Sequence, residues 1–215
     1  MRALSRIAFV PLFALALGFA LPAAAAPEPG KDFVAVNPPQ PTETGNKIEV
    51  LEIFSYACPH CNELEPKIHA WAGHLPKDVV FRRMPAVFRE SWQPLAKTYY
   101  VLEAMGQLER VHTKVFAAIH LDNVQLSKDD VLFDWIEKQG VDRKKFIEYY
   151  NSFGIQSKVK RAIQLSQAYG ITGVPSIIVD GKFLTAPSMT GSHDTLFTVM
   201  DDLIKTVAKE HTAKN

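Results

Sequence analysis

The chain has 215 residues, with 24 Lys and Arg, 23 Asp and Glu, and two cysteines. Its length suits one domain or two small ones, and its 47% hydrophobic and 10% aromatic content is typical of a globular protein. A formal charge of +1 gives no reason to expect nucleic acid or an anionic membrane as a partner, and two cysteines exclude a disulfide-rich scaffold or a four-cysteine metal site.

The N-terminus has the pattern of a secretory signal peptide. Arg2 and Arg6 precede an uncharged apolar stretch over residues 7–27, which ends in small alanines. An uncleaved membrane anchor is the alternative, because the stretch is barely long enough to span a bilayer. The alanines favour cleavage before Ala26, which removes residues 1–25. Cleavage leaves 22 positive against 23 negative side chains, a net charge of −1, in an oxidising compartment.

Hydrophobic patterning predicts a strand, a helix and a second strand in the first half of the mature chain. After a Pro-rich lead-in over residues 26–46, the β-prone apolar run at 48–55 suits a central strand covered on both faces. Helical spacing follows over residues 59–75, and the strand pattern returns at 79–87. This order predicts a βαβ unit.

The second half of the chain begins with helices and ends with a hairpin and a helix. Residues 91–166 have helical spacing with short polar breaks, which predicts four to five helices, one of them opening with a capping box at Ser127. Asp180 and Gly181 separate two short apolar runs and predict a tight hairpin turn. Ser192 is expected to cap the last helix. The whole pattern is that of an α/β fold interrupted by a helical block.

Both cysteines lie in the segment Cys58-Pro59-His60-Cys61, between the first predicted strand and helix. Structural zinc would need two further ligands, and the seven histidines show no HxxxH or HExxH spacing. Covalent haem needs a histidine directly after the second cysteine, where Asn62 stands. The remaining interpretation is a redox-active dithiol rather than a metal site.

The place of this motif favours a thiolate at Cys58. Cys58 is predicted at a helix N-cap with Pro59 at the first helical position, so that free N–H groups and the helix dipole point at its sulfur. His60 adds a positive charge or a donor beside it. A fall in the Cys58 pKa from ~8.5 to ~5.5 would stabilise the reduced form by ~2 kcal/mol at pH 7 and raise the reduction potential by roughly 45 mV. We expect Cys58 to be the exposed nucleophile and Cys61 its buried partner.

Glu52 lies in the apolar strand, six residues before Cys58. An edge-strand glutamate would face solvent, whereas the apolar residues that share its face indicate burial beneath the motif, and the pattern alone leaves both open. A buried carboxyl has a raised pKa and could take the proton from Cys61. Arg82 or Arg83 on the next strand could pair with it.

The assembled motifs resemble the DsbA family of bacterial periplasmic thiol oxidases. Residues 50–61, with their Cys-Pro-His-Cys sequence, look like the active-site segment of that family, and residues 179–182 look like its hairpin. Gly173-Val174-Pro175 is similar to the cis-proline loop of the family. Base rates alone predict a trans bond before Pro175, whereas the resemblance implies a cis bond packed against the disulfide. It also implies that Val174 presents its backbone to an extended substrate strand.

For the fold, the resemblance implies an α/β thioredoxin fold with an inserted all-helical domain. The thioredoxin-like parts would be residues 26–88 and 167–215, and the insertion residues 89–166. The resemblance also implies a buried Glu52, with Arg83 as its possible charge partner. The family usually has lysine at that position, and an arginine does not titrate, which puts a proton relay through it in doubt.

For the function, the resemblance implies a periplasmic thiol:disulfide oxidase. It would donate the Cys58–Cys61 disulfide to unfolded or reduced secreted proteins and be reoxidised by a quinone-linked membrane partner of the DsbB type. We expect a monomer with no nucleic-acid partner. One alternative is a reductase, or a specialised oxidase with few substrates. Another is a non-catalytic periplasmic binding protein or holdase, which would use the groove beside Pro175 and the helical block.

Overall fold

The computed structural model describes residues 26–214. The predicted signal peptide, residues 1–25, lies outside the described residues. Within the described part of the chain, no helix combines the length and the apolar character needed to cross a membrane.

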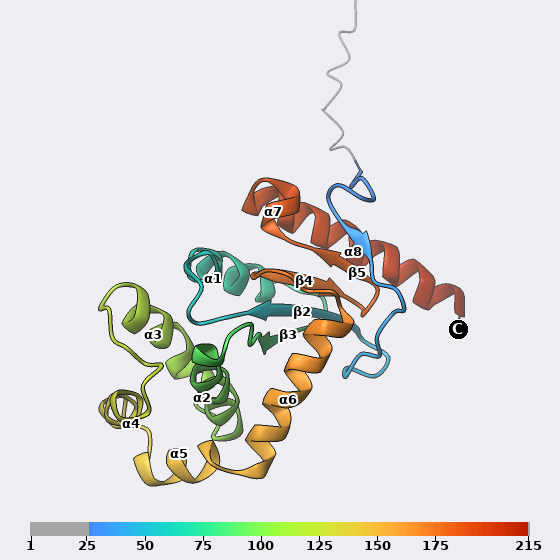
Figure 1. Ribbon diagram of the computed structural model, residues 1–215. Coiled ribbons are helices and arrows are strands. Elements are labelled where there is room, and N and C mark those ends of the chain that lie inside the picture. Colours follow the sequence, from blue (N-terminus) through green and yellow to red (C-terminus); the bar gives the residue numbers. More distant parts are fainter. Residues whose placement is uncertain (1–25, 215) are drawn as a thin grey trace, which may run out of the picture.

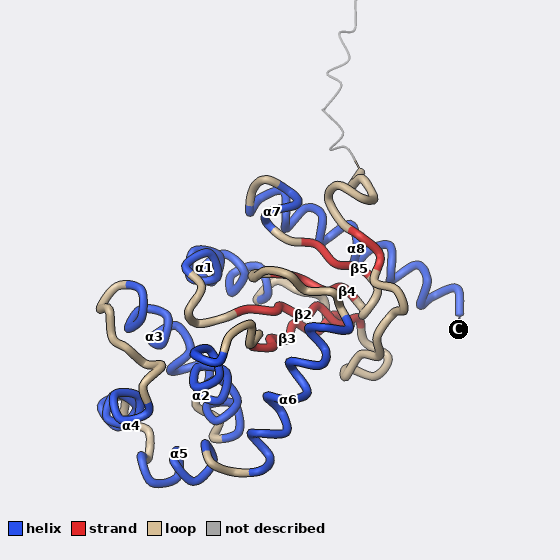
Figure 2. The backbone as a smooth tube through the Cα atoms, in the orientation of Figure 1, coloured by secondary structure: helices blue, strands red, loops and turns tan. Residues whose placement is uncertain are grey.

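A five-stranded mixed sheet forms the centre of the fold (Figures 1 and 2). Its strands run in the order β1-β5-β4-β2-β3; β2 and β3 are parallel, and the other neighbours are antiparallel. All seven residues of β2 are buried, as its apolar run predicts for a central strand. The strands are β1 (Val34–Ala35), β2 (Ile48–Phe54), β3 (Val79–Pro85), β4 (Ser176–Val179) and β5 (Phe183–Thr185).

The helices fall into three groups along the chain (Figure 1). One helix, α1, makes the crossover between the parallel strands β2 and β3, which confirms the predicted βαβ unit. Along the chain, helices α2 to α6 come after β3 and before β4 and form the predicted helical block. Helices α7 and α8 follow the hairpin. The bounds are α1 (Pro59–Ala72), α2 (Gln93–Ala104), α3 (Leu108–His120), α4 (Asp129–Lys138), α5 (Arg143–Tyr150), α6 (Phe153–Ala168), α7 (Pro187–Thr190) and α8 (His193–Lys214), with a 3₁₀ turn at Glu90–Trp92.

The two faces of the sheet contribute to separate hydrophobic clusters. On one face, Ile48 and Val50 of β2 pack with Leu64 of α1 and the apolar stripe of α8. On the other face, Leu51 and Ile53 belong to a larger cluster that continues through α2 to α6. The helical block therefore shares one core with the sheet.

Local signals at and after the hairpin of β4 and β5 are confirmed. Asp180 and Gly181 both have positive φ, 52° and 66°, as the tight turn between β4 and β5 requires. The hydroxyl of Ser192 accepts a hydrogen bond from the backbone N–H of Thr195 at 3.0 Å and so caps α8.

The capping box predicted at Ser127 is wrong. Helix α4 begins at Asp129, and its N-cap is Lys128, which makes no side-chain cap. Asp129 and Asp130 occupy the first turn instead, where their charge favours the positive end of the helix dipole.

We predict that Gly181→Ala destabilises the protein by about 3 kcal/mol or more. The new Cβ would collide with the backbone carbonyl of Gln40, whose own N–H is bonded to the Gly181 carbonyl at 3.0 Å. Gly45→Ala is the matched control, because Gly45 has a similar φ of 64° but nothing within 4 Å of the added carbon; it should cost only about 1 kcal/mol. Urea unfolding measures both, and equal losses would contradict the predicted collision.

Candidate active site

The cysteine pair lies just after the end of β2, at the start of α1. Cys58 is the N-cap of α1, in extended conformation, and Pro59 is its first residue. The Cys58 Sγ lies 3.3 Å from the carbonyl oxygen of Val174, to which the protonated thiol donates. Cys61 has no exposed surface, and only 8% of Cys58 is exposed. Cys58 is thus less exposed than the sequence predicts, because the loop that carries Val174 lies against its sulfur.

The two thiols have very different proton affinities. The pKa of Cys58 is lowered to about 6, chiefly by the hydrogen bond from the Cys61 side chain; burial opposes this, while the backbone N–H groups of Cys61 and His60 and the charge of His60 add to it. Burial, together with the Cys58 sulfur, raises the pKa of Cys61. At pH 7 a Cys58 pKa of about 6 favours the reduced form by ~1.4 kcal/mol, or roughly 30 mV. In the reduced pair at pH 7, Cys58 is therefore mostly a thiolate and Cys61 is a thiol.

A groove opens beside Cys58. The Val174–Pro175 peptide bond is cis, and a hollow of about 480 Å³ runs from this loop toward α7. Its walls combine apolar side chains with small polar ones and two histidines, which suits an extended peptide. The lining includes His60, Gly173, Val174, Pro175, Leu184 and Met189.

Beneath the cysteines lies a buried charge cluster. Glu52 is 1% exposed and sits directly opposite Arg83 in the parallel register of β2 and β3. The Arg83 Nε donates to a Glu52 oxygen at 2.9 Å, and its Nη2 donates to a Glu65 oxygen at 2.9 Å. Burial raises the pKa of Glu52 to about 7, with Arg83 acting against it and Glu65 adding to it. A carboxyl with this pKa can exchange a proton near neutral pH.

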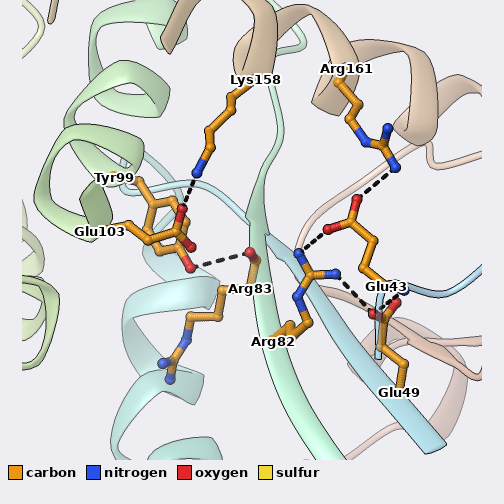
Figure 3. Close-up of polar contacts among 8 residues, drawn as sticks. All are labelled: Glu43, Glu49, Arg82, Arg83, Tyr99, Glu103, Lys158 and Arg161. Carbon is orange, nitrogen blue, oxygen red and sulfur yellow. Dashed lines mark hydrogen bonds and ion pairs between the residues drawn. The ribbon is translucent and has the colours of Figure 1, made fainter. Parts of the chain in front are cut away.

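Arg82 serves a different cluster. Successive residues of a strand point to opposite faces of the sheet, so Arg82 and Arg83 diverge, as Figure 3 shows. Arg82 donates to Glu49 at 2.9 Å and pairs with Glu43 on the side of the sheet that faces α6. Of the two arginines considered for Glu52, the structure pairs Arg83 with it and turns Arg82 away.

Sequence reasoning missed three residues of the buried cluster: Glu65, His112 and Tyr56. Glu65 had a signal, since it stands one helical turn after Cys61 and so shares its inward face. His112 had none, because it comes from α3 and only tertiary packing brings it to α1. Among the described residues, no three His, Cys, Asp or Glu side chains gather in a way that could hold a metal ion.

Comparison with known proteins assigns the chain to a family. The model of the DSBA-like thioredoxin domain matches residues 77–197. The thiol:disulfide interchange protein DsbA of Burkholderia cepacia is 41% identical over 194 residues, which is 90% of this chain and 92% of that protein. The chain belongs to the DsbA family.

Solved DsbA structures agree with the fold. The crystal structure of Pseudomonas aeruginosa DsbA matches with a TM-score of 0.82 at 37% identity, covering 87% of this chain and 97% of that one. Neisseria meningitidis NmDsbA1 matches with a TM-score of 0.76 at 26% identity, covering 85% and 95%. The sheet with α1 and α8 is therefore a DsbA-type thioredoxin fold, and α2 to α6 are its helical insertion, as predicted. As a member of this family, the protein is a thiol:disulfide interchange enzyme.

We predict that Cys61→Ala raises the pKa of Cys58 by about one unit or more, because it removes the side-chain donor that most stabilises the thiolate. Cys61→Ser is the matched control, since its hydroxyl can still donate, and it should keep the Cys58 pKa near 6. The thiolate absorbance at 240 nm, followed from pH 4 to 10, measures both values. If alanine and serine gave the same Cys58 pKa, the assigned role of the Cys61 donor would be wrong.

Proposed function

We propose that the protein is a periplasmic disulfide oxidase that passes its Cys58–Cys61 disulfide to reduced secreted proteins. The observation that carries this proposal is the asymmetry of the cysteine pair. One sulfur is stabilised as a thiolate at a helix N-terminus beside a groove, and the other is buried as a thiol. Such a pair holds electrons well in its reduced form and therefore gives up its disulfide readily.

The exchange takes two steps. A substrate thiolate attacks the Cys58 sulfur, the Cys58–Cys61 bond breaks, and Cys61 leaves and takes up a proton. A second substrate thiolate then attacks the substrate sulfur of the mixed disulfide, and Cys58 leaves as a thiolate. The substrate dithiol loses two electrons and two protons. The enzyme gains the two electrons and keeps one proton on Cys61, and the other proton goes to solvent.

Glu52 is the proposed proton donor for Cys61. It is buried below the cysteine, its charge acts on the Cys61 thiol, and its pKa of about 7 lets it give or accept a proton at neutral pH. Arg83 holds the carboxylate form in place but does not carry the proton, because a guanidinium stays charged. Val174 and Pro175 border the groove and are the proposed substrate contacts, with Pro59 and His60 shaping the thiolate site.

The proposal includes a compartment and a partner. The signal-peptide pattern of residues 1–25 supports export to the periplasm. Reoxidation by a quinone-linked membrane protein of the DsbB type would restore the disulfide, so the thiols need no bound cofactor. We propose that the protein acts as a monomer and does not bind nucleic acid.

We predict that Cys58→Ser abolishes oxidation of a reduced, unfolded model protein, with oxidised glutathione as the terminal oxidant. The serine variant cannot form the Cys58–Cys61 disulfide, so the rate should fall to the uncatalysed value. Tyr149→Ser, on an exposed part of α5, is the control and should keep wild-type activity. Unchanged activity in the Cys58 variant would exclude the mechanism, and protection of the substrate from aggregation without either cysteine would favour a holdase.

We also predict a reduction potential well above the roughly −270 mV of thioredoxin. The stabilised Cys58 thiolate lowers the free energy of the reduced form, which raises the potential. Because the pKa of Cys58 is depressed, this advantage is complete above the ordinary thiol pKa and is lost as the pH falls through about 6. Equilibration with glutathione buffers at pH 5, 7 and 9 measures it. A value near that of thioredoxin at pH 7 would favour a reductase.

A further inference from the structure

His112 reaches the buried charge cluster from the helical insertion. It is 4% exposed on α3, and its Nε2 lies 3.3 Å from the Glu65 oxygen that also accepts from Arg83. Its Nδ1 lies 2.6 Å from the hydroxyl of Tyr56, two residues before Cys58. The histidine thus connects the loop that carries Cys58 to the carboxylate that competes for Arg83.

The surroundings fix the protonation state of His112. Burial lowers the pKa of its imidazole, against the pull of Glu65, and burial also raises the pKa of Tyr56 well above its usual value. A neutral phenol donates its proton to Nδ1, so the remaining ring proton sits on Nε2 and points toward Glu65. The Nε2 contact falls outside good hydrogen-bond geometry, so its effect on Glu65 is mainly electrostatic.

The cluster contains one permanent cation for two carboxylates. Arg83 lies 2.9 Å from both Glu52 and Glu65, and a second Glu65 oxygen, Oε1, is buried without a partner. A group other than Arg83 that stabilises the Glu65 carboxylate weakens the competition of Glu65 with Glu52 for the Arg83 guanidinium. His112 is placed to do this.

The other groups that face His112 do not replace it. Tyr99 from α2 lies with its ring centroid 6.1 Å away and donates its hydroxyl to the Arg83 carbonyl at 3.2 Å. Glu109, on the same helix as His112, is exposed, and its charge raises the imidazole pKa only as a minor contribution. Among these groups, His112 is the one whose ring nitrogen lies beside a Glu65 oxygen.

We propose that His112 is a positioning residue for the redox step: by its contact with Glu65 it leaves the guanidinium of Arg83 to Glu52, the carboxyl beneath Cys61. The inference rests on the proposed function where it gives Glu52 the proton exchange with Cys61. It differs from a packing role, which His112 also has through Phe54 and Phe116 at ring-centroid distances of 5.5 and 5.3 Å. A packing role predicts a loss of stability, whereas a positioning role predicts a change in the titration of Glu52.

The test is the titration of Glu52 in the reduced protein, followed by NMR of ¹³C-labelled glutamate carboxyls. In His112→Leu, Arg83 shifts toward Glu65, so the Glu52 midpoint should rise from near 7 by roughly half a unit or more. In His112→Gln the amide N–H can take the place of the Nε2 donor, and the midpoint should stay close to that of the wild type. An unchanged midpoint in a folded leucine variant would overturn the proposal, as would equal shifts for leucine and glutamine.

A double-mutant cycle with Glu65 tests whether His112 affects the Glu52 pKa through Glu65 or through a general change in the structure. Glu65→Gln removes the competing carboxylate, so the Glu52 midpoint should fall, and His112→Leu should add nothing in that background. A full leucine shift in the Glu65→Gln background would show that His112 does not act through Glu65. If the leucine variant does not fold, Glu65→Gln still decides, because an unmoved Glu52 midpoint contradicts the shared use of Arg83. These titrations need no substrate, so they stand apart from the activity assay of Cys58→Ser.

Discussion

The parallel register between β2 and β3 is the constraint on which the active site depends. It sets Glu52 opposite Arg83 and Leu51 opposite Arg82. A buried carboxylate without a cation would be costly, and the register supplies one from the neighbouring strand. Strand β2 ends just before the motif. The pairing that places Glu52 beside Arg83 therefore also places Cys58 and Cys61 beyond the C-terminal end of β2. A slip of one residue would turn both arginines to the wrong faces.

Two adjacent arginines thereby serve two separate tasks on opposite faces of the sheet. Arg83 pairs with Glu52 and Glu65, whereas Arg82 joins Glu49 and Glu43 under α6, where Arg161 also contacts Glu43 (Figure 3). Pairs as exposed as Lys158–Glu103, which links α6 to α2, contribute little to stability by themselves. The apolar core that the insertion shares with the sheet sets its orientation. That orientation brings α3 against α1, so the insertion contributes a histidine to the buried cluster beneath the cysteines.

The sequence predicts the parts of this structure whose cause is local. The apolar run of β2, the turn at Asp180 and Gly181, and the N-cap position of Cys58 each follow from neighbouring residues. Ser127 shows the limit of local signals, because a cap motif of four residues does not decide where α4 begins once tertiary contacts form. Local signals do not give the small exposure of Cys58 either, since Val174, which contacts it, lies 116 residues further along the chain.

The choice between Arg82 and Arg83 has the same origin as the missed His112. Both depend on which face of an element meets which neighbour, and that is set by register and packing over long sequence separations. The resemblance to a family favoured Arg83 by alignment, but the physical reason is the pairing of β2 with β3. His112 required, in addition, the docking of the insertion. Residues that act through others are therefore the hardest to find from sequence, because their type and spacing give no chemical pattern of their own.

The asymmetry of the two thiols arises largely within the pair itself. The Cys61 side chain is the largest influence that lowers the pKa of Cys58, and the hydrogen bond and charge of Cys58 raise the pKa of Cys61 in return. This mutual stabilisation exists only in the reduced state, because the disulfide has neither a proton to donate nor a charge to accept it. Helix α1 adds backbone N–H groups to the outer sulfur, and burial keeps the inner one protonated. Donation of the disulfide is thus favoured because the reduced product is stabilised. The fold contributes by holding one sulfur at the helix N-terminus and burying the other.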